Sequence, residues 1–214
     1  MGVAQILELE SIGDDVWRAW TPPGSNRTDI YGGQVAGQAL RAASLSVEPG
    51  LLANSAHCYF LRRGQPELPL DIHVERVRAG RTYASRRIDV RQDGRSIFAM
   101  LASFHTEEPG GTYDHDMPPG VPGPEEVAAP DHPPGWGPEF ELRSIDVEAP
   151  VVRWWGRIPG PLGDDPALHL CGLLYASDMR AGGAAIAALG YEDAGGPPRG
   201  DDGRPIGNFG SLDH

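Results

Sequence analysis

The chain has 214 residues, which is enough for one large domain or two small ones. Its 18 basic residues, all arginine, face 30 acidic residues, so the net charge is −12. This excess of acids disfavours a general nucleic-acid-binding protein, because cations must displace the counterions on phosphates. No apolar run approaches the ~18 residues of a membrane span, and the start lacks a signal-peptide pattern. Only two cysteines are present, in apolar surroundings. We therefore expect a cytoplasmic globular protein with reduced thiols and neither nucleic acid nor membrane as a partner.

The composition changes sharply once along the chain. Half of the residues between 109 and 138 are Pro or Gly, which can neither sustain a helix nor supply a full set of strand hydrogen bonds. This segment predicts a linker. We therefore expect an N-terminal domain over 1–107, a linker over 108–140 and a C-terminal domain over 141–214.

The N-terminal block predicts one long helix and several strands. A short aromatic strand covers Val16 to Trp20, and an apolar stripe at helical spacing predicts a helix over Ile30 to Val47. The strand-like runs that follow cover 57–61, 72–77, 82–91 and 96–104. Gly80 and Gly94 stand between the later runs, as hairpin turns require. A helix followed by an antiparallel meander must bury the face of the sheet on the helix, which is an α+β arrangement.

The C-terminal block begins in the same order. Residues 144–157 predict a strand region and 167–189 a helix, and the chain stops at Ser211 to His214, where another strand would start. The second block therefore repeats the opening of the first. The counterpart of the later meander is missing, so we expect the second domain to be incomplete.

Asp178 falls on the apolar stripe of the second predicted helix, together with Cys171, Leu174 and Tyr175. A carboxylate in such a stripe is costly without partners and is a candidate catalytic group. Two other interpretations remain equally open. Asp178 could bind the end of a neighbouring helix, or the stripe could turn outward at this point.

Arginine is concentrated in the N-terminal meander. Between residues 62 and 95 the chain holds nine arginines against five acids. Guanidinium groups suit phosphates, so an anionic ligand such as a nucleotide-bearing thioester would fit. For most of these arginines we favour cross-strand ion pairs on an exposed sheet face, and we expect a ligand role for only one or two.

Several motifs, in the same order, resemble the acyl-CoA thioesterase II family. Residues 30–43 read IYGGQVAGQALRAA, 55–64 read SAHCYFLRRG and 74–87 read VERVRAGRTYASRR. After the linker the resemblance resumes with YASD at 175–178 and GSLDH at 210–214. It implies two fused hotdog domains, each a long helix wrapped by an antiparallel sheet, of which the second is incomplete here.

The resemblance also implies an activity, which is the hydrolysis of acyl-CoA to free fatty acid and CoA without a metal or another cofactor. In that family an Asp, a Thr and a Gln orient the attacking water. Asp178 matches the Asp, Ser211 stands in place of the Thr, and the Gln has no counterpart before the chain ends. We therefore expect these 214 residues alone to turn over acyl-CoA weakly or not at all.

In hotdog proteins the glycine-rich start of a helix commonly faces the substrate, so Gly32 and Gly33 are candidates for contact with acyl-CoA, although we favour close helix–sheet packing as their role. Among the arginines of the meander, Arg62 is the candidate for binding the substrate. The resemblance also implies a homo-oligomer, because hotdog domains usually pair. Two alternatives to an enzyme stay open at this point: a non-catalytic acyl-CoA-binding hotdog protein, and a structural subunit.

Overall fold

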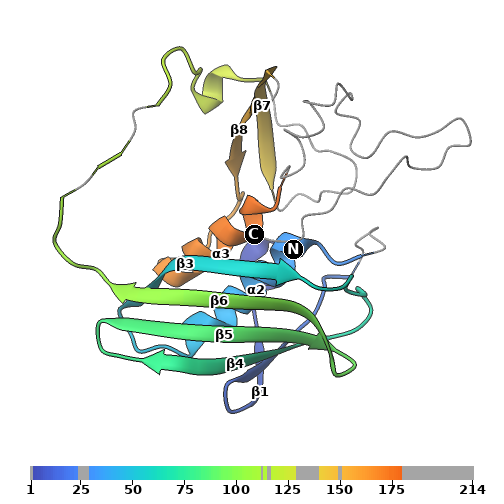
Figure 1. Ribbon diagram of the computed structural model, residues 1–214. Helices are drawn as coiled ribbons and strands as arrows, with labels where there is room; N and C mark the ends of the chain where they lie inside the picture. Colours follow the sequence, from blue (N-terminus) through green and yellow to red (C-terminus); the bar gives the residue numbers. More distant parts are fainter. Residues whose placement is uncertain are drawn as a thin grey trace, which may run out of the picture. The chain divides into compact units, whose positions relative to one another are not determined.

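A computed structural model describes residues 2–23, 29–111, 113–114, 117–128, 140–148 and 151–179 (Figure 1). These residues belong to two compact units. The first unit contains Met1–Pro109 and Gly160–Met179, and the second contains Gly110–Pro159. The domain boundaries that we expected at 107 and 140 stay a prediction.

The first unit is built on a six-stranded antiparallel sheet with the strand order β1-β2-β4-β5-β6-β3. Three helices accompany it. The elements are α1 (Val3–Ile6), β1 (Glu10–Gly13), β2 (Val16–Ala19), α2 (Gly32–Leu45), β3 (Leu51–Phe60), β4 (Leu70–Ala79), β5 (Tyr83–Gln92), β6 (Arg95–Thr106) and α3 (Pro166–Ser177). The predicted helix and meander are therefore confirmed, with β3 starting six residues earlier than the first strand-like run.

Tight turns set the register of the meander. Asp93 and Gly94 join β5 to β6 with φ values of 47° and 73°. Two consecutive left-handed residues are what a two-residue hairpin with native strand twist requires, and Gly accepts this backbone at little cost. The Gly94 turn expected from the sequence is thus confirmed.

The core lies between α2 and the inner face of the sheet, as Figure 1 shows. The buried face of α2 carries small and branched apolar residues, and the strands contribute larger ones. Side chains of this core include Val35, Ala39, Leu40, Ile72, Ile88, Val90, Phe98, Met100 and Phe104. On β5 and β6 the buried residues alternate with less buried ones, as expected for a sheet with one covered face.

One charged side chain enters this core. Arg86, on β5, is 2% exposed, and its guanidinium donates to Ser46 Oγ (2.7 Å) and to the backbone oxygens of Ser46 (2.9 Å), Arg78 (2.7 Å) and Ser85 (3.0 Å). Burial lowers the pKa of Arg86. Because Ser46 is the C-cap of α2, the positive charge also faces the negative end of the helix dipole. Arg86 therefore ties the end of α2 to the sheet.

The helices α2 and α3 run antiparallel and pack closely. Gly33 meets Tyr175, Gly37 meets Cys171, and further along α2 Arg41 meets the residue that caps α3. Positions four apart lie on one face of a helix, so the two glycines give α2 a surface without side chains. This antiparallel contact brings the end of α3 to the start of α2.

The second unit contains η1 (Pro124–Glu126) and a hairpin of β7 (Glu141–Glu148) and β8 (Val151–Arg157). The indole N–H of Trp155 donates to the Pro122 backbone oxygen at 2.9 Å, which holds the preceding segment against the hairpin. We predicted one strand region here, and the structure resolves it into two paired strands.

The helix predicted to reach Leu189 ends instead at Ser177, with Asp178 as its C-cap. The Met179 N–H bonds to the Ala176 oxygen at 2.9 Å, a three-residue step that closes the last turn. Residues after Met179 lie outside the described residues, so the further positions of the predicted helix are not tested.

Candidate active site

The candidate site forms where the end of α3 meets the start of α2. The Gly33 N–H donates a hydrogen bond of 3.0 Å to Oδ2 of Asp178. Asp178 is half-buried. The carboxylate therefore binds the end of a neighbouring helix, which is one of the interpretations that the sequence left open, and a catalytic role for Asp178 stays a prediction.

Glycine is required at this junction by the distances between the helices. A Cβ on Gly33 would stand 2.1 Å from the Tyr175 backbone oxygen. A Cβ on Gly32 would stand 2.6 Å from Asp178 Oδ2 and 2.8 Å from the Phe60 ring. Both are far below ordinary contact distances: a side chain at Gly33 would force the helices apart, and one at Gly32 would displace the Asp178 carboxylate and the Phe60 ring. The glycines therefore allow the carboxylate to reach the helix terminus.

The electrostatics of the junction favour an ionised carboxylate. The start of an α-helix carries about half a positive charge and has backbone N–H groups without helical partners. An anion there gains about 1 kcal/mol. Among the residues that the structure describes, no acceptor is bonded to the neighbouring N–H of Gly32. The junction thus combines an acceptor for a proton with a donor for a developing negative charge.

A second contact fixes the opposite end of the helix pair. Arg41 donates to Asp165 Oδ2 at 2.8 Å, and the other carboxylate oxygen of Asp165 accepts the Ala167 N–H at 3.0 Å as the N-cap of α3. Burial by itself would raise the pKa of Asp165, but these bonds, together with the charge of Arg41, leave it lowered. Since α3 is held at both ends, Asp178 cannot slide along α2.

The structure brings together three of the five candidate residues: Asp178, Gly32 and Gly33. Arg62 lies just after β3, exposed, where its guanidinium donates to the Ser96 backbone oxygen at 2.5 Å. Ser211 lies outside the described residues. The roles assigned to all five residues stay predictions.

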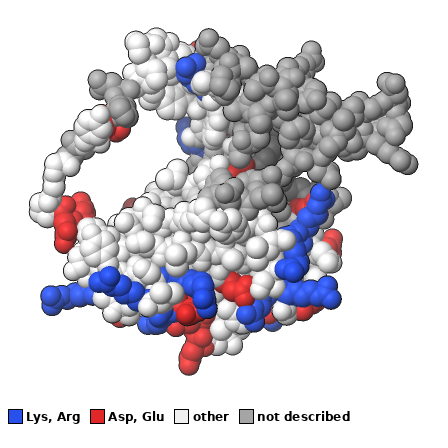
Figure 2. Space-filling view, in the orientation of Figure 1, with Lys and Arg blue, Asp and Glu red and all other residues white. Residues whose placement is uncertain are grey.

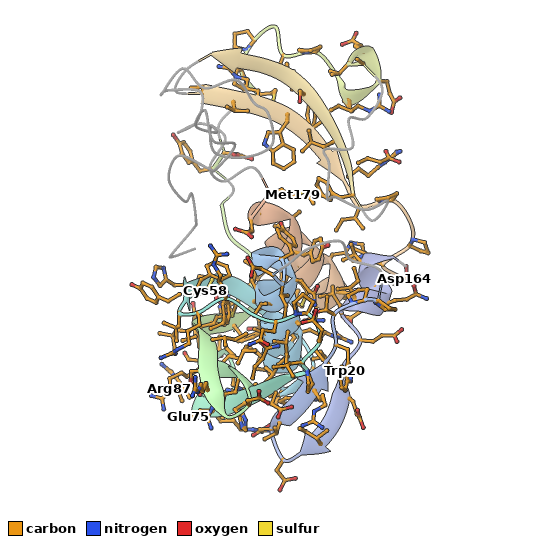
Figure 3. The ribbon with its side chains drawn as sticks, turned by 90° about the vertical axis from the view of Figure 1, so that its right-hand side faces the viewer. Trp20, Cys58, Glu75, Arg87, Asp164 and Met179 are labelled. Atoms are coloured by element: carbon orange, nitrogen blue, oxygen red, sulfur yellow. The ribbon has the colours of Figure 1, made fainter. Side chains whose placement is uncertain are left out.

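Most other arginines of the meander are engaged within the fold. Arg87 pairs with Glu75 across β4 and β5, and Arg91 contacts Asp89 at 2.6 Å. Figure 2 shows basic and acidic side chains mixed over the strands, and Figure 3 shows Glu75 and Arg87 beside one another on the sheet. Among the ion pairs described for these arginines, only Arg87–Glu75 joins neighbouring strands, so the cross-strand pairing that we expected for most of them is found at one.

Two aromatic residues at the junction were missed by the sequence analysis. Tyr31, the N-cap of α2, is 8% exposed, and Phe60, the last residue of β3, lies against Gly32. Both stand inside the recognised motifs, directly before Gly32 and within the aromatic run of β3. Their position in the motifs is a signal that could have identified them.

Two features are absent from the part of the chain that the structure describes. No group of three or more His, Cys, Asp or Glu side chains there could hold a metal ion. Nor is any helix in that part long and apolar enough to cross a membrane.

The long helix α2 wrapped by an antiparallel sheet is the arrangement of a hotdog-fold protein. Residues 21–105 match the family model described as the acyl-CoA thioesterase N-terminal domain. Human acyl-coenzyme A thioesterase 8 is 31% identical over 217 residues, which cover 86% of this chain and 67% of that protein. The mouse protein of the same name is 30% identical with the same coverage.

Two solved structures are also similar to this chain. The crystal structure of acyl-CoA thioesterase II TesB2 from Mycobacterium marinum has a TM-score of 0.74 and 34% identity, covering 86% of this chain and 71% of its own. The tesB protein of Mycobacterium avium subs paratuberculosis has a TM-score of 0.76 and 33% identity, with 88% and 73% covered. The chain therefore belongs to the acyl-CoA thioesterase II family.

Proposed function

We propose that this chain hydrolyses acyl-CoA thioesters to free fatty acid and CoA. The observation that carries the proposal is the 3.0 Å bond between the Gly33 N–H and the Asp178 carboxylate. The bond supports the proposal because a carboxylate beside a helix N-terminus can act as a general base, and the chain belongs to a family of acyl-CoA thioesterases. Both groups come from motifs that resemble the family pattern.

In the proposed reaction, Asp178 accepts a proton from a water molecule as the water oxygen attacks the thioester carbonyl carbon. The carbonyl oxygen becomes an oxyanion, which the N–H of Gly32 and the positive end of α2 stabilise. The tetrahedral intermediate then collapses, the carbon–sulfur bond breaks, and the CoA sulfur leaves with the proton that Asp178 accepted, which returns Asp178 to its ionised form. The Ser211 hydroxyl is proposed to help orient the water.

The same proposal gives Arg62 a contact with the anionic part of CoA. Arg62 is exposed, and its only described side-chain bond is to a backbone oxygen, so its positive charge is not neutralised by that partner. A guanidinium in this state suits a phosphate. Arg62→Gln is expected to raise KM and leave kcat unchanged.

We also infer a homo-oligomer in the cytoplasm. Among the described strands, β3 borders only β6, so one side of this ten-residue strand has no strand partner in that part of the chain. An open edge favours pairing. Size-exclusion chromatography with light scattering tests the oligomer, and a mass of one chain contradicts it.

The experiment that tests hydrolysis measures CoA thiol release from a medium-chain and a long-chain acyl-CoA with enzyme in excess. Excess enzyme resolves slow rates as well as fast ones. Release above spontaneous hydrolysis supports the proposal. If the protein binds a thioether analogue of acyl-CoA tightly but releases no CoA from the thioesters, it is a non-catalytic acyl-CoA-binding protein.

A further inference from the structure

The Tyr31 side chain connects the two helices that form the site. Its hydroxyl donates to the Tyr175 backbone oxygen at 2.8 Å, and the two tyrosine rings meet edge to face with centroids 5.1 Å apart. Tyr31 is 8% exposed and Tyr175 is 3% exposed. The hydrogen bond is therefore buried, where water cannot replace it.

This bond lies next to the Asp178 contact in both helices. Tyr31 is the N-cap of α2, two residues before Gly33, and Tyr175 lies in the last turn of α3, three residues before Asp178. The last carbonyls of a helix and the first N–H groups of a helix both lack helical partners. Here the start of α2 supplies a donor to each of two acceptors at the end of α3.

We propose that Tyr31 is a positioning residue, whose hydroxyl fixes the last turn of α3 and thereby holds the Asp178 carboxylate at the start of α2. The Tyr31 bond joins the start of α2 to the end of α3 two residues away from the Gly33 bond. Two bonds at different points restrict the orientation of the last turn of α3 more than the Gly33 bond does by itself. The expected effect of Tyr31 on turnover rests on the proposed hydrolysis, whereas its effect on the position of the Asp178 carboxylate does not.

The ring and the hydroxyl of Tyr31 have separable roles. The ring also covers Gly33, since its Cε1 and Cζ atoms lie 2.6 Å from where a Cβ on Gly33 would stand. Tyr31→Phe keeps this packing and removes only the bond to the Tyr175 oxygen. The variant is therefore expected to fold, and thermal unfolding checks that it does.

The first readout is the NMR signal of the Gly33 amide, which needs no turnover. A hydrogen bond to a carboxylate moves an amide proton downfield, so Asp178→Asn should move the Gly33 signal upfield. We expect Tyr31→Phe to move it in the same direction. Tyr83→Phe is the matched control, because Tyr83 is 44% exposed on β5, and it should leave the signal in place.

The second readout is kinetic. Tyr31→Phe should lower kcat about tenfold, the effect of losing one buried hydrogen bond, with KM unchanged. In the Asp178→Asn background the same substitution should have no further effect on kcat, because the group that it positions is gone.

Each outcome decides a different question. An unchanged Gly33 signal with an unchanged kcat overturns the positioning role, and a lower unfolding temperature with an unchanged Gly33 signal shows a purely structural one. If the unsubstituted protein releases no CoA, the proposed hydrolysis fails. In that case the chemical shift of the Gly33 amide alone tests whether Tyr31 positions Asp178.

Discussion

Gly33→Ala is the substitution that tests the packing of the site most severely. The added Cβ would stand 2.1 Å from the Tyr175 backbone oxygen, whereas an ordinary contact of this kind needs roughly 3.4 Å. The helices must therefore separate by more than about 1 Å. Overpacking of this size lowers the free energy of unfolding by about 1–3 kcal/mol. The higher helix propensity of Ala offsets at most about 1 kcal/mol of this loss.

We expect a net loss of about 1–2 kcal/mol, which lowers Tm by roughly 2–8 °C in a chain of this size. Turnover should fall ~100-fold, because a displacement of about 1 Å misplaces the base. Gly37→Ala is the matched control on the same face of α2. There the nearest atoms lie 3.1 Å from the added Cβ, and one belongs to the flexible Leu7 side chain. Gly33→Ala with unchanged Tm and turnover would refute the close contact of α2 and α3.

Two further predictions concern the body of the fold. Arg86→Met should lower the free energy of unfolding, measured by urea denaturation, by about 3 kcal/mol, because it leaves several buried acceptors without a donor. Arg87 is the exposed neighbour, and Arg87→Met should change the free energy of unfolding by less than about 0.5 kcal/mol. Burial raises the pKa of the Cys171 thiol to about 12, so neither Cys171 nor the buried Cys58 should react with a thiol reagent at pH 8 until urea unfolds the protein. Fast labelling of the folded protein would contradict this burial.

The sequence predicted the elements whose patterns are local. The helix α2 begins and ends within two residues of the prediction, because its apolar stripe is regular and long. By contrast, α1 and β1 are four residues each, too short for a period to be visible. The early part of β3 was missed because Leu51 to Ala56 lacks the β-branched and aromatic residues that favour strands.

The sequence named three residues that the structure brings together, and it offered the contact of Asp178 with a helix end only as one of several interpretations. Asp178 was expected within a long helix, but it ends α3 and binds a backbone N–H 145 positions earlier in the chain. Periodicity reports which face of a helix a residue occupies and cannot report a contact at that separation. The motif containing Gly32 and Gly33 did carry this information, since adjacent glycines at a helix start permit a close approach.

The measurement that tests the central claim most directly compares single-turnover CoA release by the unsubstituted protein, by Asp178→Asn and by Asp164→Asn. Asp164 is exposed just before α3, so it serves as the matched control (Figure 3). The account predicts that Asp178→Asn reduces the rate at least ~100-fold while a thioether analogue of acyl-CoA still binds, and that Asp164→Asn keeps the unsubstituted rate. Equal rates for all three proteins would contradict the assignment of Asp178 as the base.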